Sequence, residues 1–336
     1  MWHNIWYALL GLFLAGYLAL DGITLGTGII GGRLARDDAE RRTVAAATGP
    51  FFLGNEVWLV AAAGITLGGF PGLESGVISG VYPVIVCAVA ALLVREAATQ
   101  FRRRGSGERS LRRWDALVRF ACLTLALMWG LLGGVLIGAI PVKDGHLPID
   151  AAVLLQPVAI LSALTAVAVF ALHAAVFLAV RTEGSVAGRA AGLARRLAPA
   201  AAGLAALTAL VAVADSTVRD GLLNPLPTAL LFLAALAALL LAPRIIASAG
   251  WKALLVSGFA ALSPVLLLGA AHFPQALVSS AGAGEDVSVA EAAADPSTLA
   301  VVGPVVLLVL PVLLAFQAMQ WWAHRAKADD RSPAYF

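Results

Sequence analysis

The sequence has 336 residues, of which 60% are hydrophobic and 13% are charged, and its formal net charge is +3. A soluble domain usually carries about a quarter charged residues, so this composition excludes a water-soluble globule. The apolar runs reach the roughly 20 residues that an α-helix needs to cross a bilayer, longer than the about 10 alternating residues of a barrel strand.

These runs predict an all-α integral membrane protein with about nine transmembrane helices in a single membrane domain, residues 1–336. The first run begins near Trp6 and is read as a retained helix, because it lacks a basic leader and a small-residue cleavage site. We expect four helices within 6–140, four within 155–271 and a ninth at 299–322. In chain order the predicted spans are 6–29, 50–69, 76–95, 119–140, 155–180, 197–214, 227–243, 251–271 and 299–322.

Basic residues between the spans predict their orientation. Arginines follow the first, third and fifth spans and close the chain, whereas the alternate loops hold only Lys143 and Arg219. Arg95 is counted here with the basic residues that follow the third span, and segment 102–113 is read as a topology determinant that also contacts anionic lipid head groups. Because cytoplasmic loops carry the excess of lysine and arginine, we expect the amino terminus outside and the carboxyl terminus in the cytoplasm.

Polar residues inside the spans are a second signal, because each ionisable group is costly to place in lipid. Asp21, Asn55, Glu56, His173 and Arg119 are predicted to lie at similar depth near the cytoplasmic side. One interpretation is a path for protons or cations from the cytoplasm. The other is a structural layer of interhelical contacts, with Arg119 as one candidate partner of Asp21 and Glu56. These residues alone favour neither interpretation.

Candidate redox and metal ligands are few. Cys87 and Cys122 both lie in apolar runs without motif spacing, which indicates neither a disulfide framework nor a metal site. His173 is a lone imidazole within a span, which is more typical of a packed, hydrogen-bonded residue than of a haem ligand. We therefore expect no catalytic, metal-binding or cofactor-binding residue in this chain.

Several motifs resemble one family, the small, haem-free subunit II of cytochrome bd-type quinol oxidases. GYLALDGITLGTG in the first span is similar to the family's Leu-Asp-Gly with a trailing Leu-Gly-x-Gly, and TGPFFLGNEVWL resembles its most specific stretch. LAVRTEG resembles the family's Leu-x-x-Lys/Arg-Thr-x-Gly, and the order of the last external loop and final span also agrees. The matching positions are Gly22, Gly54, Trp58, Arg181, Thr182 and Gly184.

The resemblance implies two membrane subunits in the bacterial inner membrane. A larger subunit I would hold two b-type haems and a haem d or further haem b, oxidise ubiquinol or menaquinol, and reduce oxygen to water. This chain would bring no cofactor; it would stabilise subunit I, hold a structural quinone or lipid and, in some members, conduct cytoplasmic protons toward the oxygen-reducing haem. The implied partners are subunit I, quinol through that subunit, membrane lipids and, as an open option, a small accessory subunit, but no nucleic acid.

Two positions depart from the family pattern. Thr24 stands where members carry a second aspartate, and Leu53 stands where they carry an aspartate before the Gly-Asn pair. Those acids are associated with the proton path, so proton conduction and a purely structural role both stay open. The alternative from another class is a proton- or ion-coupled secondary transporter, which predicts inverted repeats and broken helices near the midplane.

Overall fold

The structure of the chain is a computed structural model that describes residues 2–102, 104–105, 107–138, 151–280, 286–329 and 331–332. Lys143 and the last two residues of the fourth predicted span, 139–140, lie outside these ranges. Within them, nine helices are long and apolar enough to cross a membrane, which confirms the predicted fold class. These are α1 (Trp2–Leu34), α2 (Asp38–Thr48) with η1 (Gly49–Phe51) and α3 (Phe52–Gly69), α5 (Tyr82–Arg102), α6 (Glu108–Ile137), α8 (Pro157–Arg181), α9 (Gly184–Ala214), α11 (Pro225–Leu241) with η3 (Ala242–Arg244), α12 (Gly250–His272) and α14 (Pro296–Ala323).

Several helices extend beyond the predicted apolar spans. α9 begins at Gly184, whereas its span was predicted to begin at 197, and α5 continues to Arg102 rather than ending at 95. The reason is that apolar run length reports the part of a helix that can lie in lipid, while the helix itself continues through charged residues. The additional turns bring arginines to one end of the bundle.

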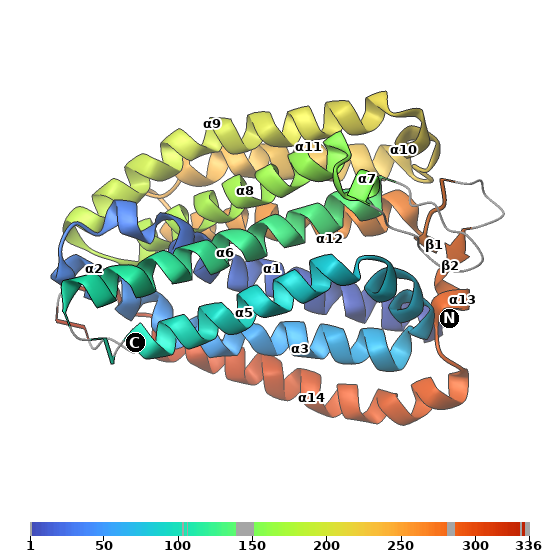
Figure 1. Ribbon diagram of the computed structural model, residues 1–336, viewed down its shortest axis with the longest axis horizontal. Coiled ribbons are helices and arrows are strands. Elements are labelled where there is room, and N and C mark those ends of the chain that lie inside the picture. Colours follow the sequence, from blue (N-terminus) through green and yellow to red (C-terminus); the bar gives the residue numbers. More distant parts are fainter. Residues whose placement is uncertain are drawn as a thin grey trace.

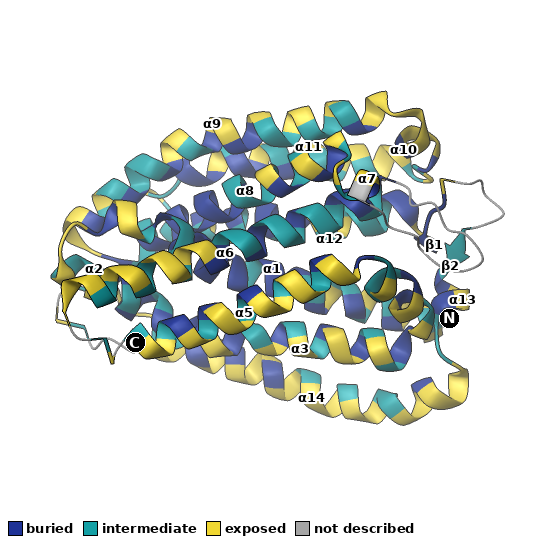
Figure 2. Ribbon diagram, in the orientation of Figure 1, coloured by how far each residue is buried: buried dark blue, intermediate teal, exposed yellow. Residues whose placement is uncertain are grey.

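The helices form an elongated bundle with α1 at its centre (Figure 1). α1 contacts α3, α6, α8 and α12, and the most buried side chains gather on α1 and α8, whereas α14 is largely exposed (Figure 2). Close approach of α1 and α8 requires Gly26, because a Cβ there would meet the carbonyl oxygen of Phe170. The central position of α1 places its polar residues among several neighbouring helices.

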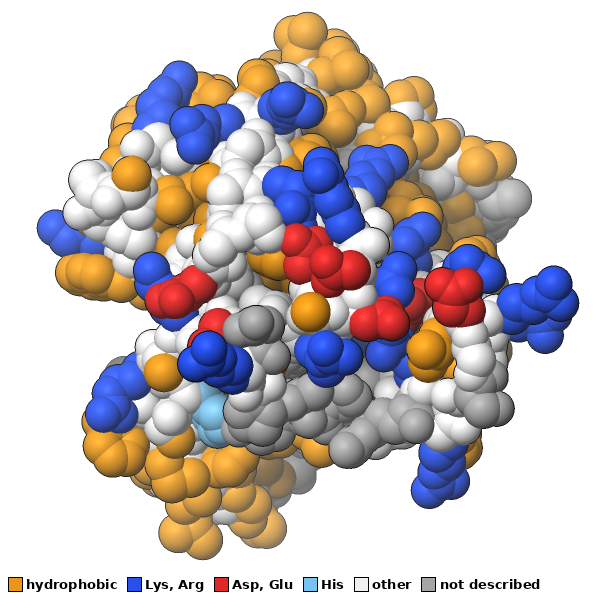
Figure 3. Space-filling model, turned by 90° about the vertical axis from the view of Figure 1, so that its left-hand side faces the viewer, with side chains coloured by type: hydrophobic (Ala, Val, Ile, Leu, Met, Phe, Trp, Pro, Cys, Tyr) orange, Lys and Arg blue, Asp and Glu red, His pale blue; other side chains and the backbone are white. Residues whose placement is uncertain are grey.

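The two ends of the bundle differ. At one end lie the carboxyl ends of α1 and α5, the beginnings of α6 and α9, and α2; we call it the basic end. Figure 3 looks onto this end and shows lysine and arginine side chains spread over it, with acidic side chains among them. The opposite end carries the amino terminus, α13 (Val289–Ala292) and a small antiparallel pair of strands, β1 (Gln275–Leu277) and β2 (Val287–Ser288) (Figure 1).

Short helical segments complete the described chain. They are α4 (Pro71–Leu73), the π-helical η2 (Glu74–Ile78), α7 (Ala151–Leu154) and α10 (Ser216–Asp220). A capping box between Ser288 and Glu291 starts α13, since the Ser288 hydroxyl accepts from the Glu291 amide and the Glu291 carboxylate accepts from the Ser288 amide. None of these segments contributes to the polar site described next.

Candidate functional site

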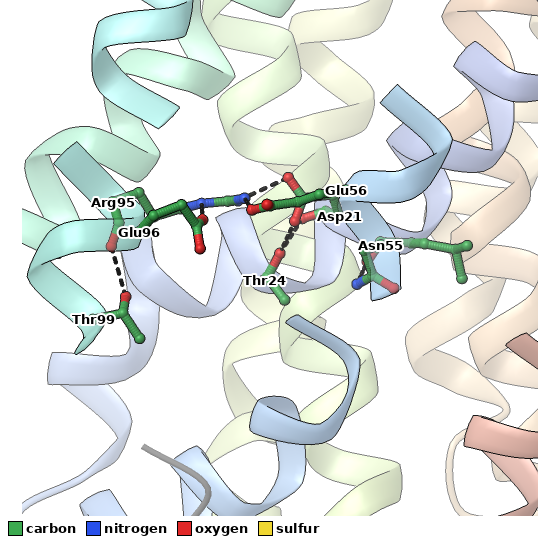
Figure 4. A network of polar contacts seen from close by, with 8 residues as sticks. Asp21, Thr24, Asn55, Glu56, Arg95, Glu96 and Thr99 are labelled. Atoms are coloured by element: carbon green, nitrogen blue, oxygen red, sulfur yellow. Dashed lines mark hydrogen bonds and ion pairs between the residues drawn. The ribbon is translucent and has the colours of Figure 1, made fainter. Parts of the chain in front are cut away.

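A fully buried arginine, Arg95 on α5, lies at the centre of the polar layer (Figure 4). Its Nη1 donates to Oδ2 of Asp21 on α1 over 2.8 Å, and its Nη2 donates to Oε1 of Glu56 on α3 over 2.5 Å. Its Nε donates to Oε1 of the neighbouring Glu96 over 3.1 Å. One guanidinium therefore joins three carboxyl groups from three helices, and we call these four residues the Arg95 cluster.

The charges of the Arg95 cluster do not balance. Three ionised carboxylates and one guanidinium would carry a net charge of −2 (−3 + 1). Uncompensated charge is costly where water is excluded. Side-chain exposure rises from 0% at Asp21 to 19% at Glu56 and 23% at Glu96, so the cluster extends from the bundle centre toward its surface. The arrangement is suited to holding and exchanging protons.

The two positions that depart from the family pattern lie in different surroundings. The hydroxyl of Thr24 lies within hydrogen-bond distance of the carboxylate and of the backbone carbonyl of Asp21, so it adjoins the Arg95 cluster (Figure 4). Leu53 is 59% exposed on α3 and faces away from the protein interior. A threonine hydroxyl thus remains beside Asp21, whereas no ionisable group replaces an acid at position 53.

The GNEVWL stretch fastens α3 to its neighbours. Asn55 donates through Nδ2 to the carbonyl of Leu20 on α1 over 2.9 Å, while its Oδ1 has no partner among the described residues. Trp58 donates through Nε1 to Gln317 of α14 over 3.4 Å, and Gly54 lies against the side chain of Gln320 on the same helix. The stretch therefore holds α3 between α1 and α14 and aims Glu56 at Arg95.

His173 lies apart from the Arg95 cluster and connects three helices. Its Nε2 donates to the carbonyl of Ala19 on α1 over 2.9 Å, and its Nδ1 lies 2.8 Å from Oγ of Ser257 on α12. Gly22 leaves room on α1 for this ring and for Phe170. Because both ring nitrogens have partners, the imidazole does not fit the role of a haem ligand. Within the described ranges, no group of three or more His, Cys, Asp and Glu side chains is arranged to hold a metal ion.

Arg119, which the sequence left open as one candidate partner of Asp21 and Glu56, does not pair with them. The Arg119 guanidinium lies beside Gly32, eleven residues along α1 from Asp21, which is about 16 Å at the α-helical rise. Arg95 is the actual partner, and it lies inside α5 rather than in the loop where its charge was counted. An arginine at the end of an apolar run looks like the end of a span, and only packing shows that this side chain turns inward.

The Arg-Thr-x-Gly motif after α8 holds the carboxyl-terminal segment. Arg181 donates through Nη1 to the carbonyl of Arg325 over 2.6 Å, and its own carbonyl accepts from the amide of Ala328 over 2.8 Å. Thr182 is buried and donates its hydroxyl to the carbonyl of Leu178 over 2.6 Å. Gly184 has φ +65°, a conformation that favours glycine and allows α9 to begin at once. This motif acts on the fold of the basic end rather than on the Arg95 cluster.

A cavity of about 440 Å³ leads from the basic end toward the Arg95 cluster. Its inner wall includes Thr24, Arg95 and Cys122, and its outer wall includes Arg102 and Arg119. The cavity lies between α1, η1, α5 and α6, with α2 at its mouth. The cavity therefore connects the basic end with Thr24, whose hydroxyl contacts Asp21.

The fold and the site together define a multi-pass membrane protein in which one buried arginine joins three carboxyl groups. The family model described as cytochrome bd terminal oxidase subunit II matches residues 2–324. The chain belongs to this family and is a subunit of a bd-type quinol oxidase, a terminal oxidase complex. The family match favours the oxidase subunit over the secondary transporter that the composition alone also permits.

Relatives cover the chain to different extents. Cytochrome bd ubiquinol oxidase subunit 2 of Bacillus subtilis (strain 168) is 28% identical over 98% of both chains. Cytochrome bd-I ubiquinol oxidase subunit 2 of Escherichia coli (strain K12) is 28% identical over 54% of this chain and 49% of its own length. A chain of the bd oxidase from Geobacillus thermodenitrificans matches the fold with a TM-score of 0.76 at 17% identity, over 96% of this chain and 98% of that chain.

Proposed function

We propose that this chain stabilises a haem-bearing subunit I and takes up protons for oxygen reduction through the Arg95 cluster. The cavity that joins the basic end to Arg95 is the observation that supports this role most strongly. The gathering of arginines at the basic end supports its assignment to the cytoplasmic side of a bacterial inner membrane. The haems that reduce oxygen are assigned to the partner subunit, which the resemblance implies.

In this proposal, water in the cavity delivers protons to the inner wall at Thr24 and Asp21. Arg95 keeps the carboxyl groups of Asp21, Glu56 and Glu96 around one centre, so a proton can pass from one carboxyl to the next. The partly exposed Glu56 and Glu96 then present the proton at the surface of α3 and α5. The threonine hydroxyl at position 24 orients Asp21 and relays a hydrogen bond, although it does not itself carry the charge.

A purely structural role is the second candidate, and it also has specific support. Arg95 ties α5 to α1 and α3, and removing one partner of a buried ion pair typically costs about 3–5 kcal/mol. If the Arg95 cluster serves assembly alone, neutralising its acids should reduce the amount of assembled complex. It should leave the turnover of each assembled complex unchanged.

Oxygen consumption per haem separates the two roles. Glu56→Gln and Glu96→Gln, each expressed with the partner subunit, should lower turnover by about 100-fold, the lower end of what one positioned acid–base group contributes, while haem content stays at the wild-type level. Glu74→Gln is the matched control, because it makes the same chemical change at an exposed residue of η2 outside the Arg95 cluster. Loss of haem with unchanged turnover per haem would support the structural role, and wild-type values for both would contradict both roles.

A further inference from the structure

The outer wall of the cavity carries more positive than negative charge. Among the described residues, four arginines line it beyond Arg95, and the single acid in the lining, Asp115, is paired with Arg102. Arg41 pairs with Asp38 outside the cavity over 2.7 Å, and Arg112 lies 3.4 Å from exposed Glu108. These four lining arginines are Arg41, Arg102, Arg112 and Arg119.

Arg119 has no hydrogen bond or ion pair within the part of the chain that the structure describes, although it lines the cavity. Its guanidinium lies against Gly32, where the lack of a side chain gives it room. A guanidinium presents several donors in a planar fork that suits carboxylate and phosphate oxygens. The wall therefore offers a charged hydrogen-bond donor for an anion, and the described residues leave this donor unused.

A second unused donor lies deeper in the same cavity. Thr27 is 8% exposed, and its Oγ1 has no hydrogen-bond partner among the described residues. Leaving a buried hydroxyl without a partner is costly, so such an atom usually has one. Thr27 precedes Gly32 by five residues on α1, which places it about 7.5 Å further from the basic end than the Arg119 guanidinium.

The sequence of sites along the cavity, from its mouth inward, matches the sequence of groups in a phospholipid head group. An anion is favoured at the outer arginines, an uncharged oxygen acceptor at Thr27, and small or apolar residues such as Gly28, Gly31 and Val44 lie between and around them. One water occupies about 30 Å³ of liquid, so a cavity of about 440 Å³ accommodates a group much larger than a phosphate ion. A glycerophosphate group can satisfy both donors at once, with its phosphate outside and an ester oxygen inside.

We propose that this cavity binds the phosphate of an anionic glycerophospholipid near its mouth, held by Arg112 and Arg119 on α6 and, through an ester oxygen, by Thr27 on α1. A basic pocket between transmembrane helices at the cytoplasmic surface is a recurring form of lipid recognition. The ligand contacts lie nearer the mouth than Thr24 and Arg95, so the head group would share the cavity with the water that reaches the Arg95 cluster, and lipid binding is measured separately from proton uptake. The same donors also suit free phosphate, so the test distinguishes the two sources.

Native mass spectrometry of the delipidated complex with its partner subunit tests this site. The probes are dioleoylphosphatidylglycerol, dioleoylphosphatidylcholine and inorganic phosphate, each titrated against wild type and the double variant Arg112→Gln/Arg119→Gln. We expect phosphatidylglycerol to bind in preference to phosphatidylcholine, and binding to weaken about 30-fold in the double variant, from about one factor of five per arginine. Thr27→Val should weaken it about fivefold, as the loss of one hydrogen bond does.

The matched control is Arg109→Gln/Arg113→Gln, which removes the same charge from exposed positions of the same helix outside the cavity lining. Binding in this control should stay within about threefold of wild type, since these charges act only through a screened surface potential. Phosphate binding with the same dependence on Arg112 and Arg119, but no bound lipid, would keep the phosphate site and assign it a soluble ligand. Equal weakening in both double variants, or no binding of any probe, would overturn the site. Oxygen turnover is recorded alongside, so that a failure here is distinct from a failure of the proton path.

Discussion

At the scale of single residues, Arg95 is the group on which the polar layer depends. Its guanidinium is the shared partner of Asp21, Glu56 and Glu96, and its side chain is 1% exposed. Three carboxyl groups would remain without their cation if Arg95 were removed, and the side chain of Asp21 among them is 0% exposed. The consequence is the same in a proton path and in a structural layer, so Arg95 reports on the integrity of the site.

Arg95→Leu should destabilise the assembled complex by about 3–5 kcal/mol, the usual cost of breaking a buried ion pair. Thermal denaturation of the purified complex, followed by loss of its haem absorbance, measures this. Arg113→Leu is the control, because Arg113 is exposed on α6. Adding Asp21→Asn to Arg95→Leu should recover part of the loss, since one unpaired carboxylate is removed. Equal stability of Arg95→Leu and Arg113→Leu would contradict the role given to this arginine.

At the scale of elements, the turn between α8 and α9 and the segment after α14 form one unit. The backbone of Ala328 donates to the carbonyl of Arg181 and accepts from the amide of Glu183. The Arg181 side chain donates to the carbonyl of Arg325. The Arg181 guanidinium also lies 5.9 Å from the ring centroid of Phe51, which itself contacts Trp321. The motif that resembles the family pattern here thus has a physical function, which is to fix the carboxyl-terminal segment at the basic end.

Arg181→Ala should release the segment after α14. We expect trypsin to cleave the purified complex after Arg325 and Lys327 about tenfold faster, because the loss of one charge-assisted hydrogen bond is worth about 1.5 kcal/mol. Arg195→Ala, an exposed change on α9, should leave the cleavage rate at the wild-type value. A segment equally resistant in both variants would show that Arg181 does not hold it.

At the scale of the whole molecule, the fold was largely predictable and the site was not. Apolar runs identified the nine helices of spanning length in the described part of the chain, because a helix in lipid must be apolar over its crossing length. Asp21 and Glu56 were also recognised, since ionisable groups stand out in such runs. Arg95 and Glu96 were missed, because a charge at the end of a run is equally typical of a loop. The helix-favouring residues after Glu96 were the available signal that α5 continues.

Orientation in the membrane is a further prediction at this scale. Single cysteines introduced as Gly188→Cys at the basic end and Ser216→Cys at the opposite end occupy exposed positions, one on α9 and one on α10. A membrane-impermeant maleimide should label Ser216→Cys in intact cells and should label Gly188→Cys only after lysis, because the arginine-rich end is expected to face the cytoplasm. The reverse pattern would place the basic end outside and remove the basis for cytoplasmic proton uptake.

Proton uptake during oxygen reduction tests the central claim most directly. The complex is reconstituted into vesicles, and the pH on the side of the basic end is followed while quinol and oxygen are consumed, in wild type, Glu56→Gln, Glu96→Gln and Glu74→Gln. The account predicts that uptake from that side slows in step with oxygen turnover in Glu56→Gln and Glu96→Gln, with haem content intact, and stays unchanged in Glu74→Gln. Unaltered proton uptake in both cluster variants, with their haem retained, would contradict it and leave this chain a structural subunit.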